Sequence, residues 1–361
     1  MVKKQLAEKS KNKLLDKEIM RHFPKIELHR HLEGSFPVKD LFDLSLKNDL
    51  NTPKDLLAFK TTVQFPKDSK PDFLLFLSKF NNTWYRTYDD VYYITYSSVR
   101  NLVKDGLFYI ELRFSPEHFS LHNNFDRQEI TRLIIEAGND AAKEINLKIK
   151  YLITFTRNKQ SQDDMIELYN KIKMLYLNDI IGVDLAGDEI NYPPVMFTTL
   201  FSRIKKDGIY KVTIHAGEVS TSEQIWEAIK KLYALRIGHG TSTIYDPALQ
   251  EFLIERGIIL EQCITSNFQT GAWEDERNHP IGKLYYRGVP VTINSDDPTI
   301  QNTDLTDDYI KAIDYFNFSF EDLVKLNLTA LKGSFLQEKE KQELITSYQI
   351  ALSRFKEQFL L

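Results

Sequence analysis

The sequence contains four short motifs whose side chains are typical of metal and acid–base chemistry. They are His29-Arg30-His31, His215-Ala216-Gly217-Glu218, Gly238-His239-Gly240 and Ser295-Asp296-Asp297-Pro298. Residues two apart on a strand point to the same face, so both imidazoles of the first motif can reach one metal ion. Three neutral imidazoles and one carboxylate form a typical Zn²⁺ site with room for a water molecule.

A site of this kind supports hydrolysis. Bound zinc lowers the pKa of a water ligand towards about 7, which generates hydroxide at neutral pH. Glu218 lies three residues after His215, and we predict that it transfers protons rather than binding the metal. His239 and Asp297 remain to orient the water and the substrate. A purely structural zinc site is closed and does not need these additional titratable groups.

Each motif also has a structural explanation when it is taken alone. A His-x-His pair is more often surface or core packing than a metal site. Two consecutive aspartates often cap a helix or lie in a solvated loop, and His239 between two glycines fits a tight turn. All of these explanations would have to hold together, so we favour one metal-dependent site.

The elements that must position these residues follow a β/α alternation. Eight β-branched or apolar runs are separated by longer helical patterns, which predicts an α/β fold, a (β/α)8 TIM barrel. The runs are 26–31, 107–114, 149–156, 180–185, 211–215, 235–239, 258–264 and 289–294. Active sites of such barrels form at the C-terminal ends of the strands, and the four motifs fall at the ends of runs one, five, six and eight.

Three segments lie outside the regular alternation. About 75 residues separate the first two runs, and the helical patterns at 37–48, 72–80 and 88–104 predict an inserted flap over one barrel mouth. Residues 305–361 predict C-terminal helices that complete the outer layer. Residues 1–22 predict a charged helical extension, so that 23–361 form a single (β/α)8 domain.

Composition narrows the class of protein. The chain has 361 residues and a net charge of only −4, which does not favour nucleic acid or an anionic membrane as a partner. A single cysteine, Cys263, excludes a disulfide framework and a cysteine-rich zinc module. No apolar run approaches the roughly 18 residues that span a bilayer, and no signal-peptide pattern is visible. We expect a cytoplasmic protein whose oligomeric state is open.

Six segments together resemble the adenosine deaminase family of the metal-dependent amidohydrolase superfamily. In order and spacing the resemblance extends from Pro24 to Phe335. The segments are Pro24–Gly34 (PKIELHRHLEG), Tyr109–Pro116 (YIELRFSP), Gly182–Glu189 (GVDLAGDE), His215–Glu218 (HAGE), Arg236–Gly240 (RIGHG) and Ser295–Pro298 (SDDP).

The resemblance implies an activity and a set of roles. The enzyme would convert adenosine or 2′-deoxyadenosine, with water, to inosine or 2′-deoxyinosine and ammonia, in purine salvage. One Zn²⁺ per chain would be held by His29, His31, His215 and Asp296. Glu218 would protonate purine N1, and His239 would hold the zinc hydroxide that attacks C6. The implied substrate-binding residues are His31, Glu33, Gly187, whose N–H would contact N3, and Asp297, which would contact N7.

One residue departs from the pattern. Glu33 stands where many adenosine deaminases have aspartate, at the position that faces the ribose 5′ region. Adenine deaminases of the same superfamily commonly have glutamate there, but they usually lack the Asp-Leu-Ala-Gly-Asp-Glu run found here at 184–189. We therefore favour a nucleoside substrate, with adenine or another 6-aminopurine as the alternative.

Other classes of protein fit less well. A binuclear amidohydrolase usually needs a bridging lysine at the end of strand three or four, and the fourth run has none. An inactive barrel that serves as a binding module would show a broken ligand set, and no expected residue is missing. Thr243 occupies the third glycine position of a Gly-x-Gly-x-x-Gly dinucleotide fingerprint.

We expect structural roles for several residues near the motifs. Glu111 and Arg113 share one face of the second strand, which predicts a structural ion pair beneath the site. Cys263 is expected to be a small buried apolar residue. Helical spacing predicts core or flap packing, with one or two side chains against the purine, for Phe73, Leu74, Phe76, Leu77 and Phe80.

Overall fold

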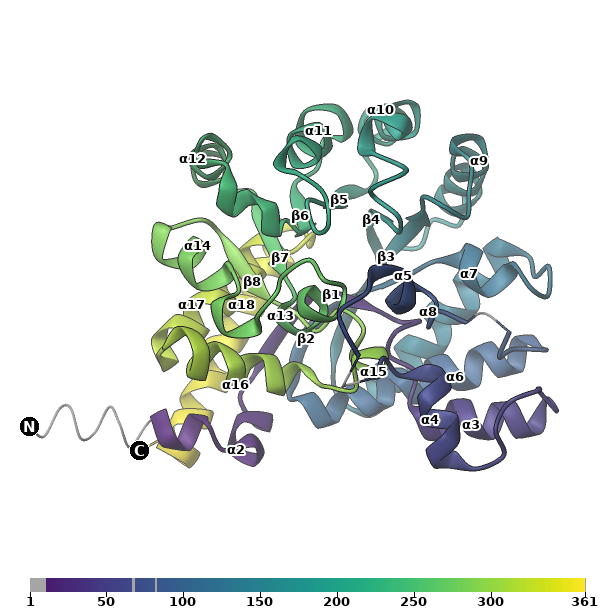
Figure 1. Ribbon diagram of the computed structural model, residues 1–361, viewed down its shortest axis with the longest axis horizontal. Coiled ribbons are helices and arrows are strands. Elements are labelled where there is room, and N and C mark those ends of the chain that lie inside the picture. Colours follow the sequence, from purple (N-terminus) through teal and green to yellow (C-terminus); the bar gives the residue numbers. More distant parts are fainter. Residues whose placement is uncertain (1–10, 67–68, 82, 361) are drawn as a thin grey trace, which may run out of the picture.

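The computed structural model describes residues 11–66, 69–81 and 83–360, and within them eight parallel strands form a sheet in sequence order (Figure 1). The strands are β1 (Lys25–His31), β2 (Leu107–Phe114), β3 (Lys148–Thr156), β4 (Ile180–Ala186), β5 (Lys211–Ala216), β6 (Arg236–His239), β7 (Ile259–Gln262) and β8 (Val291–Ile293). Just beyond β8, the N–H of Asp296 donates to the carbonyl of His29 and the N–H of His31 donates to the carbonyl of Asp296. These bonds join the last strand to the first, and the predicted barrel is confirmed.

The strands are short and buried because helices cover the outside of the barrel. All seven residues of β1 are buried, and Ile26 and Leu28 alternate with the polar side chains of Glu27 and His29. Alternation on a strand sends the two sets to opposite faces. The sequence therefore gives β1 one apolar face for helix packing and one polar face for the barrel interior.

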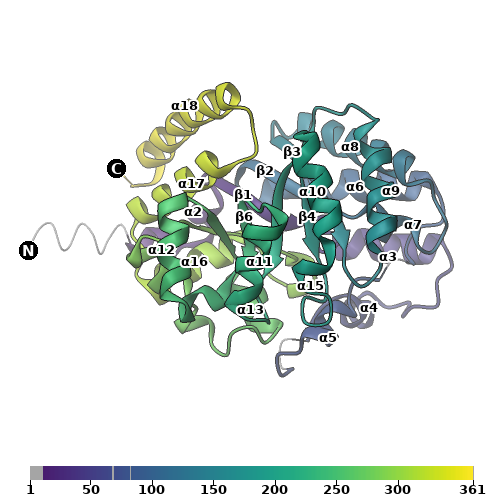
Figure 2. The same ribbon diagram turned by 90° about the horizontal axis from the view of Figure 1, so that it is seen from above.

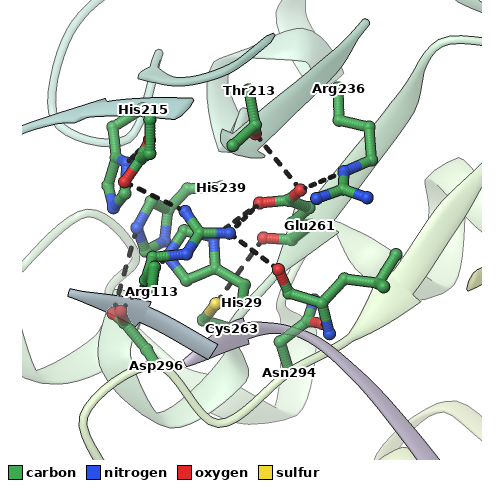
Figure 3. A network of polar contacts seen from close by, with 12 residues as sticks. His29, Arg113, Thr213, His215, Arg236, His239, Glu261, Cys263, Asn294 and Asp296 are labelled. Atoms are coloured by element: carbon green, nitrogen blue, oxygen red, sulfur yellow. Dashed lines mark hydrogen bonds and ion pairs between the residues drawn. The ribbon is translucent and has the colours of Figure 1, made fainter. Parts of the chain in front are cut away.

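The barrel interior holds a buried ion-pair network (Figure 3). Arg113 pairs with Asp184 at 3.2 Å and with Glu261 at 2.8 Å. Arg236 pairs with Glu111 at 2.7 Å and with Glu261 at 2.6 Å. The predicted Glu111–Arg113 pair is wrong, since each residue has partners on other strands. Side chains that share a face of one strand are held by residues across the barrel, which sequence spacing does not reveal.

A ring of helices surrounds the strands in Figure 1. Its members are α6 (Tyr88–Asn101), α8 (Arg127–Glu144), α9 (Gln162–Lys173), α10 (Thr198–Asp207), α11 (Ser222–Leu232), α12 (Pro247–Arg256), α14 (Ile281–Arg287) and α17 (Phe320–Gly333). Capping boxes begin three of them, at Thr87, Ser161 and Ser319, each with an aspartate three residues later. These capping boxes fix where the three helices begin. The apolar face of each helix packs against the barrel.

The segment between β1 and β2 forms the predicted insertion, with one correction. It contains α3 (Val38–Lys47), α4 (Leu56–Val63) and α5 (Phe73–Leu77). The pattern at 88–104, expected to belong to the flap, instead forms α6, which packs against α8 in the outer ring. Buried residues along α6 make it a barrel helix. Helix α4 was not predicted, because its sequence is short and ends in three β-branched residues.

The two ends of the barrel are covered differently. In Figure 2, α4 and α5 lie at one end and the C-terminal helix α18 (Glu338–Phe355) lies at the other. The predicted extension at 1–22 is partly described: residues 11–14 are helical, α2 spans Lys17–Arg21 and packs against α16 (Leu305–Phe316), and residues 1–10 lie outside the described residues. Among the described residues, no helix is long and apolar enough to cross a membrane.

Candidate active site

A cavity of about 360 Å³ opens at the end of the barrel that carries α5. Its size suits a small organic ligand. Most of the predicted site residues line it, namely His31, Glu33, Gly187, His215, Glu218, His239, Asp296 and Asp297. His29 is fully buried beneath them. Residues from four distant motifs therefore meet at the carboxyl ends of the strands, as the barrel topology requires.

Four donor groups converge at the base of this cavity. Nε2 of His31 lies 3.2 Å from Nε2 of His215, and Oδ1 of Asp296 lies 3.2 Å from Nε2 of His29 and 3.5 Å from Nε2 of His31. One ligand atom from each of the four residues lies within 4.8 Å of all the others. This spacing suits simultaneous contact with one metal ion.

The opposite ring nitrogens are held by carboxylates. Nδ1 of His29 donates to Glu261 over 2.8 Å, and Nδ1 of His215 donates to Asp184 over 2.9 Å. Arg113 pairs with both carboxylates and so keeps them ionised. Figure 3 shows His29, Glu261 and Arg113 in this arrangement. Because each carboxylate holds the proton on Nδ1, the neutral form of each ring presents a lone pair on Nε2, and this is the form that binds metal.

A second group of possible ligands overlaps the first. Within the described residues, His239 and Cys263 lie close enough to His29 and Asp296 to form a set with them. The Cys263 thiol points to the carbonyl of Glu261 over 3.5 Å, and burial raises the pKa of the thiol well above its usual value. A protonated thiol is a poor ligand. The set of three histidines and Asp296 therefore fits a divalent cation better, and Cys263 is a buried residue as expected.

Burial and neighbouring carboxylates decide the charge of these imidazoles. Burial lowers the pKa of His31 and of His215, so both are neutral. The pKa of His29 is raised, since burial and Arg113 oppose its charged form but the carboxylates of Asp296 and Glu261 outweigh them. A cation bound here would take the place of that proton.

Glu218 and His239 lie beside the donor group. Oε2 of Glu218 is 3.6 Å from Nε2 of His239, and Asn267 contacts both side chains. Burial, with the nearby Asp296 carboxylate, raises the pKa of Glu218 to about 8, so this acid holds its proton at neutral pH. The backbones of His239 and Asp296 have φ of +60° and +61°. Such strain in residues other than glycine is typical of functional sites.

On another wall of the cavity, two carboxyl groups have oxygens without partners. Oε1 of Glu33 accepts from the N–H of Ser115 over 2.6 Å, whereas Oε2 has no hydrogen-bond partner among the described residues. Asp297 Oδ1 also has none there, and a Cβ at Gly34 would lie 1.8 Å from it. Burial raises the pKa of Glu33 to about 7 and that of Asp297 well above its usual value. Both groups can therefore hydrogen-bond a ligand.

Helix α5 supplies an apolar wall. Five apolar side chains expected to pack in the core or flap line the cavity, namely Phe73, Leu74, Phe76, Leu77 and Phe80. Contact of one or two of them with a purine stays a prediction. The ring centroid of Phe80 lies 6.5 Å from that of His31. Gly187, with φ of +98°, brings its backbone to the facing wall. The cavity thus has an apolar slot with polar groups at its edges.

Sequence reasoning missed three supporting residues. Asp184 and Glu261 orient the histidines, and Asn267 contacts both Glu218 and His239. Asp184 was recognised only as part of the 184–189 run, and Glu261 and Asn267 belong to none of the motifs. Their signal was position: polar residues in or just after buried strands, where apolar ones are usual.

The barrel, its buried His/Asp group and the adjacent acid define a metal-dependent hydrolase class. The family model described as "Adenosine deaminase" matches residues 24–349. The chain belongs to this family, which confirms the resemblance seen in its motifs and the enzyme class expected from it. An adenosine deaminase of Serratia proteamaculans is 32% identical over 326 residues, which cover 89% of this chain and 96% of the relative.

Two solved structures share the fold. An adenine deaminase from Arthrobacter aurescens superposes with a TM-score of 0.83 at 22% identity, over 91% of this chain and 99% of that chain. An amidohydrolase from Burkholderia ambifaria with bound Zn has a TM-score of 0.85 at 19% identity, over 94% of both chains. At these sequence identities the two structures show that the fold is shared.

Proposed function

We propose that this protein catalyses the zinc-dependent hydrolytic deamination of adenosine and 2′-deoxyadenosine to the corresponding inosine and ammonia. The observation that carries the proposal is the placement of a protonated buried acid, Glu218, beside a cluster of three histidines and one aspartate in a cavity of nucleoside size. The adenosine deaminase relatives support the same reaction. Action in the cytoplasm stays a prediction.

The proposed metal ligands are His29, His31, His215 and Asp296, with one Zn²⁺ per chain. Nitrogen and oxygen donors in this number are typical of catalytic zinc sites, and the amidohydrolase with bound Zn shares the fold. When bound, zinc supplies a water nucleophile at neutral pH. Asp184 and Glu261 keep two of the imidazoles in the tautomer that binds metal.

The remaining groups act on the purine. Glu218 gives its proton to N1, which draws electrons from C6 and makes that carbon open to attack by water. His239 stabilises the attacking oxygen. Asp297, whose pKa is raised by burial and by the adjacent Asp296 carboxylate, contacts N7, and the N–H of Gly187 donates to N3. After water adds at C6, one of its protons goes to the amino group and the other returns to Glu218. The C–N bond then breaks, ammonia leaves, and a C6=O bond forms.

Glu33 is the residue proposed to bind the ribose. Oε2 of Glu33 is buried in the cavity without a partner among the described residues, and an unmet buried carboxylate oxygen is costly. The 5′-OH of the sugar would donate a hydrogen bond to this oxygen. The alternative is an adenine deaminase, as the Arthrobacter neighbour is named. The run at 184–189, which adenine deaminases usually lack, counts against that alternative. An inactive binding module would not need the protonated Glu218.

The experiment is an ultraviolet deamination assay on the zinc-loaded protein. Adenosine should be converted to inosine with one ammonia released per nucleoside. A chelator should abolish the conversion, and added Zn²⁺ should restore it, with one zinc per chain by metal analysis. Absence of inosine with zinc bound would contradict the proposal.

A further inference from the structure

A chain of hydrogen bonds runs from the backbone to His239. The N–H of Ile281 donates to Nδ1 of His279 over 3.2 Å, Nε2 of His279 lies 3.0 Å from Oδ1 of Asn267, and Nδ2 of Asn267 lies 3.0 Å from Nδ1 of His239. The three side chains are at most 1% exposed. Asn267 lies on α13 (Ile264–Gln269), and Ile281 is the first residue of α14. Water therefore has no access to replace these bonds.

The backbone fixes the direction of every bond in this chain. An amide N–H can only donate, so Nδ1 of His279 must accept. Burial lowers the pKa of His279 to about 3, so its neutral ring carries one proton, on Nε2. That proton goes to the amide oxygen of Asn267. The amide nitrogen of Asn267 then faces His239 and donates to its Nδ1.

The direction of these hydrogen bonds also determines which atoms of His239 and Glu218 carry their protons. With Nδ1 accepting, neutral His239 carries its proton on Nε2, which lies 3.6 Å from Glu218 Oε2 and 3.9 Å from Asp296 Oδ2. The second N–H of Asn267 points to Oε1 of Glu218 over 3.3 Å. Oε1 therefore accepts, and the proton of the Glu218 acid is directed to Oε2.

We infer that His279 and Asn267 form a polarised hydrogen-bond relay that holds His239 as an Nε2–H donor and directs the proton of Glu218 to its Oε2. His239 then stabilises the attacking oxygen by donating to it and does not act as the base. Both relay members are positioning residues, since neither lines the cavity. The mechanistic part of this inference rests on the proposed deamination, whereas the tautomer does not.

Asn267→Asp is the sharpest test, because it keeps the shape of the side chain and reverses the direction of its hydrogen bond with Nδ1 of His239. The introduced carboxylate still accepts from His279 but cannot donate, so a proton must move to Nδ1 of His239. Ring ¹⁵N shifts of histidine-labelled, zinc-loaded protein distinguish the Nδ1–H and Nε2–H forms. His239→Gln identifies the His239 signals by their loss. We expect Nε2–H in the wild type and Nδ1–H in Asn267→Asp.

Kinetics on adenosine test the consequence. Supporting residues of this kind are worth about 10–100-fold in activity. Asn267→Asp and His279→Leu should lower kcat by that factor, with KM within about twofold, because the relay acts on the transition state. His279→Gln places an amide donor near the position of Nε2 and should restore most of kcat. His22→Gln, at an exposed histidine stacked on Phe359, is the control and should change neither constant.

Three outcomes would overturn the relay: Nδ1–H on His239 in the wild type, an unchanged tautomer in Asn267→Asp, or equal kcat in His279→Leu and His279→Gln. If Asn267→Asp does not fold, judged by thermal unfolding, the wild-type spectrum and the two His279 variants still decide. A wild type with Nε2–H on His239 that does not deaminate adenosine would support the tautomer and contradict the proposed function instead.

Discussion

His31 and His215 point their Nε2 atoms at each other across 3.2 Å, from β1 and β5 on different sides of the barrel. Nδ1–H of His215 donates a hydrogen bond to the ionised Asp184 carboxylate, so Nε2 of the neutral ring has a lone pair and no hydrogen. Neutral imidazoles held this close, beside Asp296, are arranged for a cation between them. The fold thus brings the four proposed ligands together.

His215→Ala should remove both the metal and the activity, because it deletes one of four ligands. Metal analysis after dialysis is expected to show well under one zinc per chain. His118→Gln is the matched control, since His118 is a half-buried histidine that lines the same cavity outside the donor group. It should retain zinc. A fully loaded His215→Ala protein, or two zinc ions per wild-type chain, would contradict the assigned ligand set.

Glu218→Gln separates proton transfer from metal binding. The variant keeps the size of the side chain but cannot protonate N1, and general acid catalysis contributes about 10²–10⁴-fold. We expect kcat on adenosine to fall by that factor while zinc content is unchanged. Loss of zinc would show that Glu218 is a ligand, and near-normal turnover would remove it from the mechanism.

The pH dependence follows from the same acid. Burial raises the pKa of Glu218 to about 8, and the protonated form is the active one. Below that pH the acid is present, and above it the proton is lost, so kcat/KM for adenosine should decline tenfold per pH unit on the alkaline side. The residual activity of Glu218→Gln should lack this decline. A wild-type profile that rises steadily through this range would show that the ionised carboxylate is required.

Much of the barrel could be predicted because its signals are local. The β2 bounds were predicted to the residue, since an apolar run ends there at Ser115-Pro116, a helix start. The role of 88–104 was predicted wrongly because a helical pattern does not show which neighbour it packs against. The neighbour is α8, which begins only at Arg127, whereas α6 ends at Asn101.

The candidate site, like the fold, could be predicted from the sequence only in part. The residues of the four motifs could be found from their positions at strand ends. The partners of those residues could not, because Glu261 and Asp184 reach the histidines only after the barrel closes. The prediction of an ion pair between Glu111 and Arg113 was wrong for the same reason. Asn267 shows the limit most clearly, since its role depends on the direction of a bond from His279.

Glu33 should show its role in the recognition of the sugar. If its free oxygen accepts from the 5′-OH, then 5′-deoxyadenosine leaves a buried acceptor unpaired, which costs about 1–3 kcal/mol. We expect a correspondingly lower kcat/KM than for adenosine. Glu33→Gln should shrink this difference without changing zinc content. Equal kcat/KM for the two nucleosides on the wild type would place the 5′-OH away from Glu33.

The comparison of adenosine with free adenine tests the central claim most directly. Both have the same reacting ring, so Glu218, His239 and the metal act on each alike, and only the sugar contacts differ. On the zinc-loaded wild-type protein we predict a higher kcat/KM for adenosine, because the bound ribose meets the free oxygen of Glu33. Adenine turned over as efficiently as adenosine, or better, would contradict the nucleoside assignment.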